Sequence, residues 1–211
     1  MGPSFASEDV LPGSVAGIDE VGRGPWAGPV VACAVVLDRA RVPEGLRDSK
    51  TLSAGRREAL AAEIEAAAAV GIGEASVAEI DEVGVGRATL TAMERALGAL
   101  PFPPDSVLVD GVQVIAVPPG VAIRALPRAD ALSPSVAAAS IVAKVHRDAL
   151  MMALDAEWPA YGWVRNKGYG TAQHADALAR HGVTPHHRRS FAPVARRLRC
   201  HANDDAASPQ G

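Results

Sequence analysis

The chain alternates between short apolar runs and longer segments in which apolar residues recur at helical spacing. Runs rich in β-branched residues and bounded by turn-forming residues predict strands over residues 15–19, 30–37, 71–77, 106–110 and 121–125. Apolar residues three and four apart predict helices over residues 55–69, 78–83, 86–100, 130–154 and 171–181. Early strands followed by alternating helices and strands favour an α/β layer architecture, in which helices flank a mixed sheet.

The composition suits one globular domain. The chain has 211 residues, of which 48% are hydrophobic and only 4% aromatic, so it can form a sizeable core from small side chains. No apolar run is long enough to cross a bilayer, and the first residues lack the features of a secretory signal. Cys33 and Cys200 are far apart in the sequence, and Cys33 lies in an apolar run. We therefore expect no structural disulfide, no membrane partner and a cytoplasmic location.

The charges are unevenly distributed, although the net charge is only −3. Residues 44–110 contain six Lys/Arg and twelve Asp/Glu, whereas residues 164–201 contain eight Lys/Arg and one acid. An acidic middle region can bind cations, and a basic C-terminal region can bind phosphates at a separate place. The alternative is that the basic residues are simply solvated helix ends.

Four acidic residues occupy the ends of predicted elements. Asp19 and Glu20 end the first strand, Asp110 ends the strand VLVD, and Asp130 begins the long helix. Carboxylates that converge at a sheet edge repel one another unless a cation is bound, and an all-oxygen ligand set suits Mg²⁺ or Mn²⁺. Neighbouring strand residues point to opposite faces, however, so Asp19 and Glu20 share a site only if the strand bends or they coordinate differently. Separate, solvated acids are the alternative.

A glycine-rich segment, GRGPWAG over residues 22–28, follows the first strand. It superficially resembles a dinucleotide-binding turn, but Pro25 and Pro29 interrupt it and a strand follows where a phosphate-binding helix should begin. We interpret it as a tight loop that lets backbone approach a substrate, with an ordinary hairpin turn as the alternative.

Six blocks appear together and in order: GIDEVGRGPWAGPVVACAVVL, DSKTLS, VDG, ADALSPSVAAASIVAKVHRD, YGWVRNKGYGTAQHADAL and HGVTPHHRRSF. This series, spanning roughly residues 15–195, resembles the ribonuclease HII family of type 2 ribonucleases H. The resemblance implies a ribonuclease H-like fold with a helical C-terminal part. We expect an N-terminal extension over residues 1–14, a catalytic domain over 15–200 and, from the composition of the chain end, a disordered tail over 201–211.

The same resemblance assigns roles to residues. Asp19, Glu20, Asp110 and Asp130 would be the catalytic acids and would bind divalent metal. Gly22, Arg23 and Gly24 would surround the 2′-hydroxyl of a ribonucleotide, the group that distinguishes RNA from DNA. Tyr169 would stack on the sugar of the following deoxynucleotide. The remaining substrate-binding positions, near the nucleic-acid backbone, would be Lys50, Ser140 and Lys144.

The implied reaction is metal-dependent hydrolysis of the phosphodiester on the 5′ side of a ribonucleotide. The substrates would be RNA–DNA hybrids and DNA duplexes with embedded ribonucleotides, the products 5′-phosphate and 3′-hydroxyl ends, and the enzyme a monomer. Ribonuclease HIII is a less suitable match because that group usually carries an N-terminal substrate-binding domain and Asp19 comes early in this chain. A binding module without activity would have no use for four acids that repel phosphate.

Four histidines lie in the basic region, at positions 174, 181, 186 and 187. Their spacing matches no usual zinc pattern. We interpret them as part of a basic surface that faces DNA or as helix ends.

Overall fold

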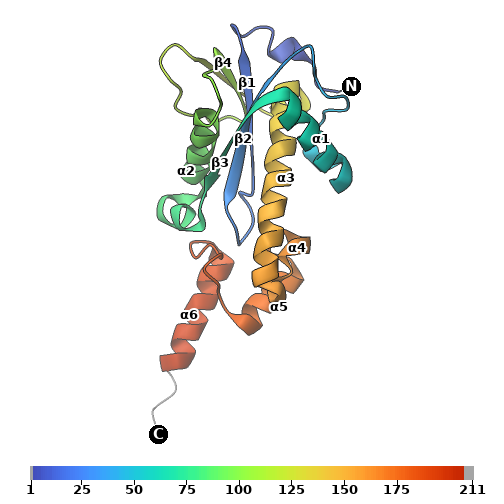
Figure 1. Cartoon of the computed structure of the whole chain (residues 1–211). Coiled ribbons are helices and arrows are strands. Elements are labelled where there is room, and N and C mark those ends of the chain that lie inside the picture. Colours follow the sequence, from blue (N-terminus) through green and yellow to red (C-terminus); the bar gives the residue numbers. More distant parts are fainter. Residues whose placement is uncertain (1, 207–211) are drawn as a thin grey trace.

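A five-stranded sheet organises the chain, and its strand order is β3-β2-β1-β4-β5 (Figure 1). The computed structural model describes residues 2–206, with side chains described for residues 2–199. The strands are β1 (Val15–Val21), β2 (Val30–Leu37), β3 (Ala68–Ala75), β4 (Ser106–Asp110) and β5 (Ala122–Leu126). The pairs β1–β2 and β2–β3 are antiparallel, whereas β1–β4 and β4–β5 are parallel. The predicted mixed sheet is therefore confirmed.

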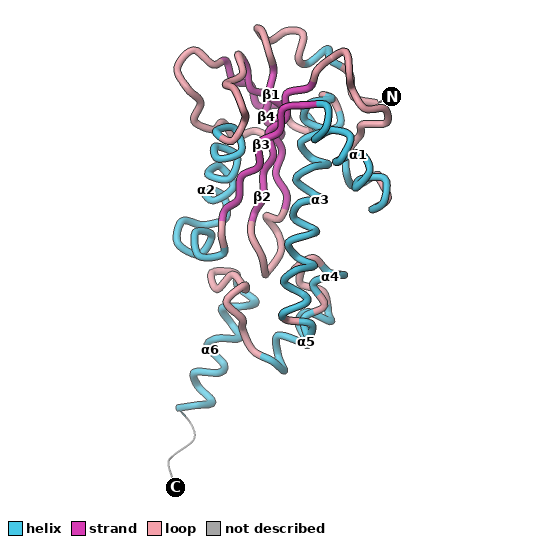
Figure 2. The backbone as a smooth tube through the Cα atoms, in the orientation of Figure 1, coloured by secondary structure: helices cyan, strands magenta, loops and turns pink. Residues whose placement is uncertain are grey.

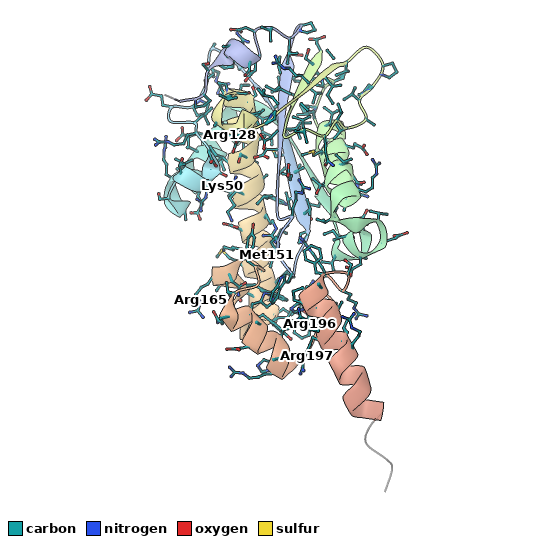
Figure 3. All side chains as sticks on the ribbon, turned by 180° about the vertical axis from the view of Figure 1, so that it is seen from behind. Lys50, Arg128, Met151, Arg165, Arg196 and Arg197 are labelled. Atoms are coloured by element: carbon teal, nitrogen blue, oxygen red, sulfur yellow. The ribbon has the colours of Figure 1, made fainter. Side chains whose placement is uncertain are left out.

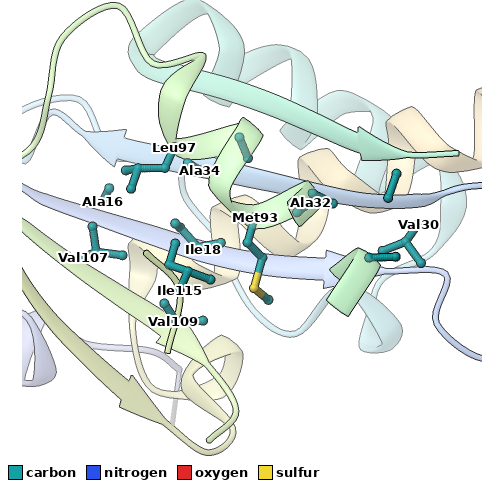
Figure 4. Packing of buried hydrophobic residues seen from close by; sticks show 14 of the residues in the cluster. Ala16, Ile18, Val30, Ala32, Ala34, Met93, Leu97, Val107, Val109 and Ile115 are labelled. Carbon is teal, nitrogen blue, oxygen red and sulfur yellow. The ribbon is translucent and has the colours of Figure 1, made fainter. Parts of the chain in front are cut away.

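Helices cover both faces of the sheet, as Figure 2 shows. Helix α2 (Val77–Gly98) packs on one face, and α1 (Ala54–Ala67) and α3 (Pro134–Glu157) pack on the other. Strand β2 serves both layers because successive side chains alternate between faces. Val30, Ala32 and Ala34 belong to the α2 core, part of which is shown in Figure 4, while the intervening residues pack against α1 and α3.

Helix α2 contains a break that the sequence predicts. Two helices are expected on either side of Gly84, and the structure joins them in one element in which Gly84 has φ 80° and ψ 152°. Ser76 caps this element by accepting from the Glu79 backbone N–H, and the Glu79 carboxylate accepts from the Ser76 N–H in return. The predicted boundaries for β2 and β4 are also confirmed.

Helix α3 packs closely on β1 because Gly17 has no side chain. A Cβ built at Gly17 would lie 2.3 Å from the carbonyl carbon of Ser135 and 2.3 Å from the backbone nitrogen of Val136. The first turn of α3 therefore rests directly on the strand that ends in Asp19 and Glu20. This contact also places the segment before α3, which carries Asp130, beside that strand.

The N-terminal residues are anchored to the same place. Glu8 is buried, and its carboxylate accepts hydrogen bonds from the Ser133 hydroxyl at 2.5 Å and from the Ser135 backbone N–H at 3.1 Å. A carboxylate suits this position because the first turn of a helix presents unpaired N–H groups. Through Glu8, the expected N-terminal extension thus contacts the beginning of α3.

The C-terminal part is helical, with α4 (Trp163–Asn166), α5 (Ala172–His181) and α6 (Ala192–Ala206). Arg165 lies on α4, and Arg196 and Arg197 lie on α6 (Figure 3). Helix α6 extends past residue 201, where disorder is expected from the sequence to begin, and residues 207–211 lie outside the described part. Within the described residues, no helix is both long and apolar enough to span a membrane.

Candidate active site

Asp19 and Glu20 point to opposite faces of the sheet. Asp19 is paired with Cys33, which packs in the layer of α1 and α3, and Glu20 is paired with Ala32, which packs in the layer of α2. Residues directly opposite in an antiparallel pair share a face. The alternation expected from the sequence is therefore confirmed at these two residues. Their carboxylates lie on opposite sides of the end of β1.

Asp110 and Asp130 are linked to each other through a backbone contact. Asp110 is the last residue of β4, which runs parallel to β1 and is paired with it through Val109 and Ile18. The Ala129 N–H donates to Asp110 Oδ1 at 2.7 Å, and Ala129 begins the short 3-10 helix that contains Asp130. All four predicted acids thus lie around the same end of β1 and β4.

Burial and repulsion between carboxylates raise the pKa of Asp19, Glu20 and Asp130. Burial, followed by repulsion from Glu20 and Asp110, raises the pKa of Asp19 well above its usual range. Burial raises the pKa of Glu20, and although Arg23 opposes the shift, Asp110 adds to it. Burial and then repulsion from Asp110 raise the pKa of Asp130. Asp110 is the charge common to all three shifts, so the acids form one electrostatic unit.

Lys50 lies at the edge of this unit. Its Nζ is 4.0 Å from Asp130 Oδ2, and its side chain is 82% exposed. Partial burial lowers the pKa of Lys50, but the surrounding carboxylates outweigh burial and raise it. Lys50 and Arg128 both lie near the beginning of α3 (Figure 3). An exposed cation beside the acids is well placed to meet a phosphate.

Ser140 and Lys144 are placed differently from Lys50. Ser140 is buried, and its hydroxyl lies 2.9 Å from the Ser49 hydroxyl. Its hydrogen bond to Asp19 partly opposes the rise in the pKa of that carboxyl. Ser140 therefore lies behind Asp19 as a support. Lys144, one helical turn further along α3, donates to Asp148 Oδ1 at 2.7 Å. The structure does not bring Lys144 to the acids.

A cleft of about 300 Å³ connects two of the acids, Glu20 and Asp110, with Arg23 of the glycine loop. It is lined by Glu20, Arg23, Thr89, Met93, Asp110, Gly111, Val112 and Gln113. Among the described residues, no three acids, histidines or cysteines are arranged closely enough to form a preformed metal site. Asp19 and Glu20 lie on opposite faces of the sheet, which contributes to this spread. The donors are carboxylate oxygens, and burial and repulsion raise the pKa of Asp19, Glu20 and Asp130, so the set fits a hard divalent cation that would relieve the repulsion.

The glycine loop joins two antiparallel strands, β1 and β2, so the rejection of a dinucleotide-binding turn is confirmed. Arg23 is half exposed, and its Nη1 lies 3.4 Å from Glu20 Oε1. Tyr169 is 46% exposed. Its ring borders the loop, because a Cβ built at Gly24 would lie 3.4 Å from Tyr169 Cε1. The structure thus brings together the Gly-Arg-Gly segment and Tyr169.

Two further contacts fix the loops that carry these residues. The Trp26 N–H donates to the Gly168 carbonyl at 2.8 Å. A Cβ at Gly170 would lie 2.0 Å from the Trp26 ring, so only glycine allows this approach. Met151 of α3 (Figure 3) is buried below both loops.

The structure corrects the interpretation of two histidines as a basic surface. His174 and His187 are buried, at 0% and 1% exposure. Their Nε2 atoms lie 3.0 Å apart, the Thr184 N–H donates to His187 Nδ1, and His174 Nδ1 lies 3.0 Å from the Tyr169 carbonyl. These contacts are all satisfied if His187 donates to His174 and His174 donates to Tyr169. The pair is then neutral and fixes the backbone of Tyr169.

Acidification is expected to destabilise the protein through this pair. Burial, followed by repulsion from His174 and His186, lowers the pKa of His187 to about 3. The folded-state pKa lies below the unfolded value of about 6.5, so the stability contribution is complete above pH 6.5 and is lost as the pH falls toward 3. Chemical denaturation at pH 7 and pH 4 should show that His187→Gln reduces the pH-dependent loss by about 1–3 kcal/mol. The exposed His181→Gln variant should retain the wild-type slope, and an unchanged slope in His187→Gln would contradict the assignment.

Comparison with known families gives a consistent result. The family model described as Ribonuclease HII matches residues 16–194. A protein named Ribonuclease HII from Jannaschia sp. is 56% identical over 200 residues, which cover 94% of this chain and 99% of the relative. A protein of the same name from Paramagnetospirillum magneticum is 55% identical over 199 residues, covering 92% of this chain and 97% of the relative.

Solved structures share the fold. The ribonuclease H2 from Pyrococcus horikoshii superposes with a TM-score of 0.76 at 26% identity, covering 89% of this chain and 98% of that one. The ribonuclease HII in a complex with PCNA from Archaeoglobus fulgidus gives a TM-score of 0.72 at 30% identity, covering 84% and 95%. A ribonuclease HIII described in complex with Mn²⁺ gives 0.72 at 22% identity, covering 95% and 74%, and shows the fold alone. The family match over most of the chain and the shared ribonuclease H-like fold show that this chain belongs to the ribonuclease HII family of type 2 ribonucleases H.

Proposed function

We propose that this enzyme hydrolyses the phosphodiester on the 5′ side of a ribonucleotide, in RNA–DNA hybrids and in DNA duplexes with an embedded ribonucleotide. The observation that carries the proposal is the single cleft in which Glu20 and Asp110 lie beside Arg23 of the glycine loop. Acids that suit phosphodiester hydrolysis and a loop that suits recognition of a sugar therefore share one binding surface. The products would be a 5′-phosphate on the ribonucleotide and a 3′-hydroxyl upstream, and the enzyme would act as a monomer.

Asp19, Glu20 and Asp110 would hold divalent metal, and Asp130 would complete the site and orient water. Bound Mg²⁺ or Mn²⁺ would supply an activated water and stabilise the leaving oxygen. The carboxylates themselves keep their orientation through fixed partners: Ser140 supports Asp19, and the Ala129 N–H supports Asp110. A Mn²⁺ complex is described for the structurally similar ribonuclease HIII, which is consistent with this assignment.

Recognition would lie with Gly22, Arg23, Gly24 and Tyr169. The loop would approach the 2′-hydroxyl through its backbone, and the Tyr169 ring would contact the next sugar from its position against Gly24. Lys50, exposed beside Asp130, would neutralise a backbone phosphate as the substrate enters. Lys144, which donates to Asp148 Oδ1, and Ser140 would lie near the backbone of the substrate.

The proposal is tested with a labelled DNA duplex that contains one ribonucleotide, incubated with Mg²⁺, Mn²⁺ or a chelator beside an all-DNA duplex. We expect metal-dependent incision 5′ to the ribonucleotide and no cutting of the control. Cutting of a long RNA–DNA hybrid without cutting of the single-ribonucleotide duplex would remove the recognition role of the loop. A folded protein that cuts neither substrate would refute the proposed activity.

Replacing Tyr169 should affect the two substrates unequally. Tyr169→Ala removes the ring that borders Gly24, so incision at a single ribonucleotide should fall by about tenfold or more, a loss comparable to that of one stacked base. Incision of a uniform hybrid should fall less, because it offers no RNA–DNA junction at most positions. Rates are compared on both substrates with Val164→Ala, an exposed neighbour, as the control. Equal losses on both substrates would exclude junction sensing by Tyr169.

A further inference from the structure

Arg188 is a fully buried arginine whose guanidinium lies over the Phe191 ring, 5.1 Å from the ring centroid, and donates its described hydrogen bonds to backbone carbonyls of the glycine loop. It donates through Nη1 to the Arg23 carbonyl at 2.8 Å, through Nη2 to the Gly22 carbonyl at 2.5 Å, and through Nε and Nη2 to the Gly28 carbonyl. The residue is 0% exposed. Within residues 2–199, no carboxylate forms an ion pair with it.

Asp81 exerts a favourable electrostatic effect on Arg188 but forms no ion pair with it, and a buried charge without a directly paired carboxylate is expensive, so its presence calls for an explanation. Arginine presents a planar set of donors, and here that set matches carbonyls from two ends of one loop. The backbone of Arg188 also donates to the Trp26 carbonyl at 2.8 Å. Both the main chain and the side chain of Arg188 therefore hold the segment from Gly22 to Gly28.

The direction of these contacts determines where the loop's N–H groups point. In a trans peptide the C=O and the following N–H point in opposite directions, and the described chain contains no cis peptide. Because Arg188 binds the carbonyls of Gly22 and Arg23 from the protein interior, the N–H groups of Arg23 and Gly24 face the other way. In the described structure neither N–H has a hydrogen-bond acceptor. The side of Gly24 on which its Cβ would lie is bordered by the Tyr169 ring.

We propose that Arg188 is a positioning residue for ribonucleotide recognition. Its hydrogen bonds to the Gly22 and Arg23 carbonyls orient the N–H groups of Arg23 and Gly24 toward the sugar of the substrate. The inference rests on the proposed function, since it explains how the loop is held ready for a 2′-hydroxyl. Arg188 acts through the loop and does not itself touch the substrate.

Arg147 provides the matched control. It is also 0% exposed and also donates to backbone carbonyls, those of Ala27, Pro29 and Lys167. Its side chain also packs against Gly22, where a Cβ would lie 2.2 Å from Arg147 Nε, but it does not donate to the carbonyl of Gly22 or of Arg23. If Arg188 served only to hold the C-terminal part on the sheet, lysine at either position would have similar consequences. If Arg188 orients the two donors, only Arg188→Lys should change the preference for ribose.

The experiment measures the affinity of wild type, Arg188→Lys and Arg147→Lys for a fluorescent duplex with one ribonucleotide and for the same all-DNA duplex, in EDTA so that no cutting occurs. We expect wild type to prefer the ribonucleotide duplex and Arg188→Lys to lose about threefold to tenfold of that preference, the change expected for one net hydrogen bond. Arg147→Lys should keep the wild-type ratio within about twofold, and all three proteins should bind all-DNA alike. An unchanged ratio in Arg188→Lys, or equal losses in both variants, would overturn the inference.

Wild-type incision in Mg²⁺ separates this inference from the proposed function. A wild type that does not cut at the ribonucleotide refutes the proposed function, whereas one that cuts but binds both duplexes equally overturns the inference alone. If Arg188→Lys does not fold, hydrogen exchange of the Arg23 and Gly24 amides in the wild type tests whether these two N–H groups are free to meet a substrate. The Arg23 and Gly24 amides should exchange as fast as exposed amides and shift selectively with the ribonucleotide duplex, and protected amides would overturn the inference.

Discussion

Asp110→Asn should lower the turnover number at least about 10³-fold while the affinity for the ribonucleotide duplex, measured in EDTA, stays within about threefold. Loss of one anionic ligand from a hydrolytic metal site removes several kcal/mol of transition-state stabilisation, and each 1.36 kcal/mol corresponds to about tenfold in rate. Asparagine keeps the shape of the side chain and can still accept from the Ala129 N–H. The defect should therefore lie in catalysis and not in folding.

The same variant should be at least as stable as the wild type when metal is absent. Asp110 contributes repulsion to Asp19, Glu20 and Asp130, so removing its charge relieves all three. Thermal denaturation in EDTA measures this effect. Asp105→Asn is the control, because Asp105 precedes the other end of β4 and bonds to Ser14, far from the cleft. Wild-type turnover in Asp110→Asn, or an equal loss in Asp105→Asn, would refute the catalytic assignment.

Gly17→Ala should destabilise the protein by about 2–4 kcal/mol, and the melting temperature should fall by roughly 4–16 °C. A Cβ at this position would collide with the backbone of Ser135 and Val136. Backbone in the first turn of a helix cannot rotate aside as a side chain can, so α3 must move away from β1. Such a movement also separates the beginning of α3, and with it Asp130, from Asp19.

The matched control is Gly86→Ala, which lies within α2 and has no atom within 4 Å of the position that the new methyl group would occupy. Alanine at position 86 should raise the free energy of unfolding by up to about 1 kcal/mol, since it reduces the conformational entropy of the unfolded chain and favours the helix. Both variants are compared by chemical denaturation and by incision rate. A Gly17→Ala protein with wild-type stability would show that α3 does not pack on β1 as closely as described.

The parts of the fold that could be predicted are those in which one local pattern dominates. Strands β2 and β4 are apolar runs bounded by loops or charges, and the break at Gly84 coincides with a glycine in an otherwise helical segment. Helix α6 is absent from the predicted elements, because its polar and basic residues offer little apolar periodicity. The four acids could be selected because each ends or begins a predicted element, and the parallel pairing of β1 with β4 then brings them together.

What the sequence could not reveal is which charges are buried. Arg188 and His187 belong to the basic region of the sequence, yet both lie in the interior, where they bind backbone carbonyls or a second histidine. Burial of a polar residue depends on partners that are distant in the chain, and Arg188 finds its carbonyl partners about 160 residues earlier. Glu8 has no sequence signal for the same reason, since its partners Ser133 and Ser135 follow more than a hundred residues later.

The opposite orientations of Asp19 and Glu20 make activity depend on both hydrophobic layers at once. Asp19 faces the layer of α3 and Glu20 faces the layer of α2, so a disturbance in either layer should shift one of these carboxylates relative to the other. Substitutions that loosen two cores with no shared residues should therefore produce the same loss of incision. The relative position of these two carboxylates therefore depends on correct packing of the helices on both faces of the sheet.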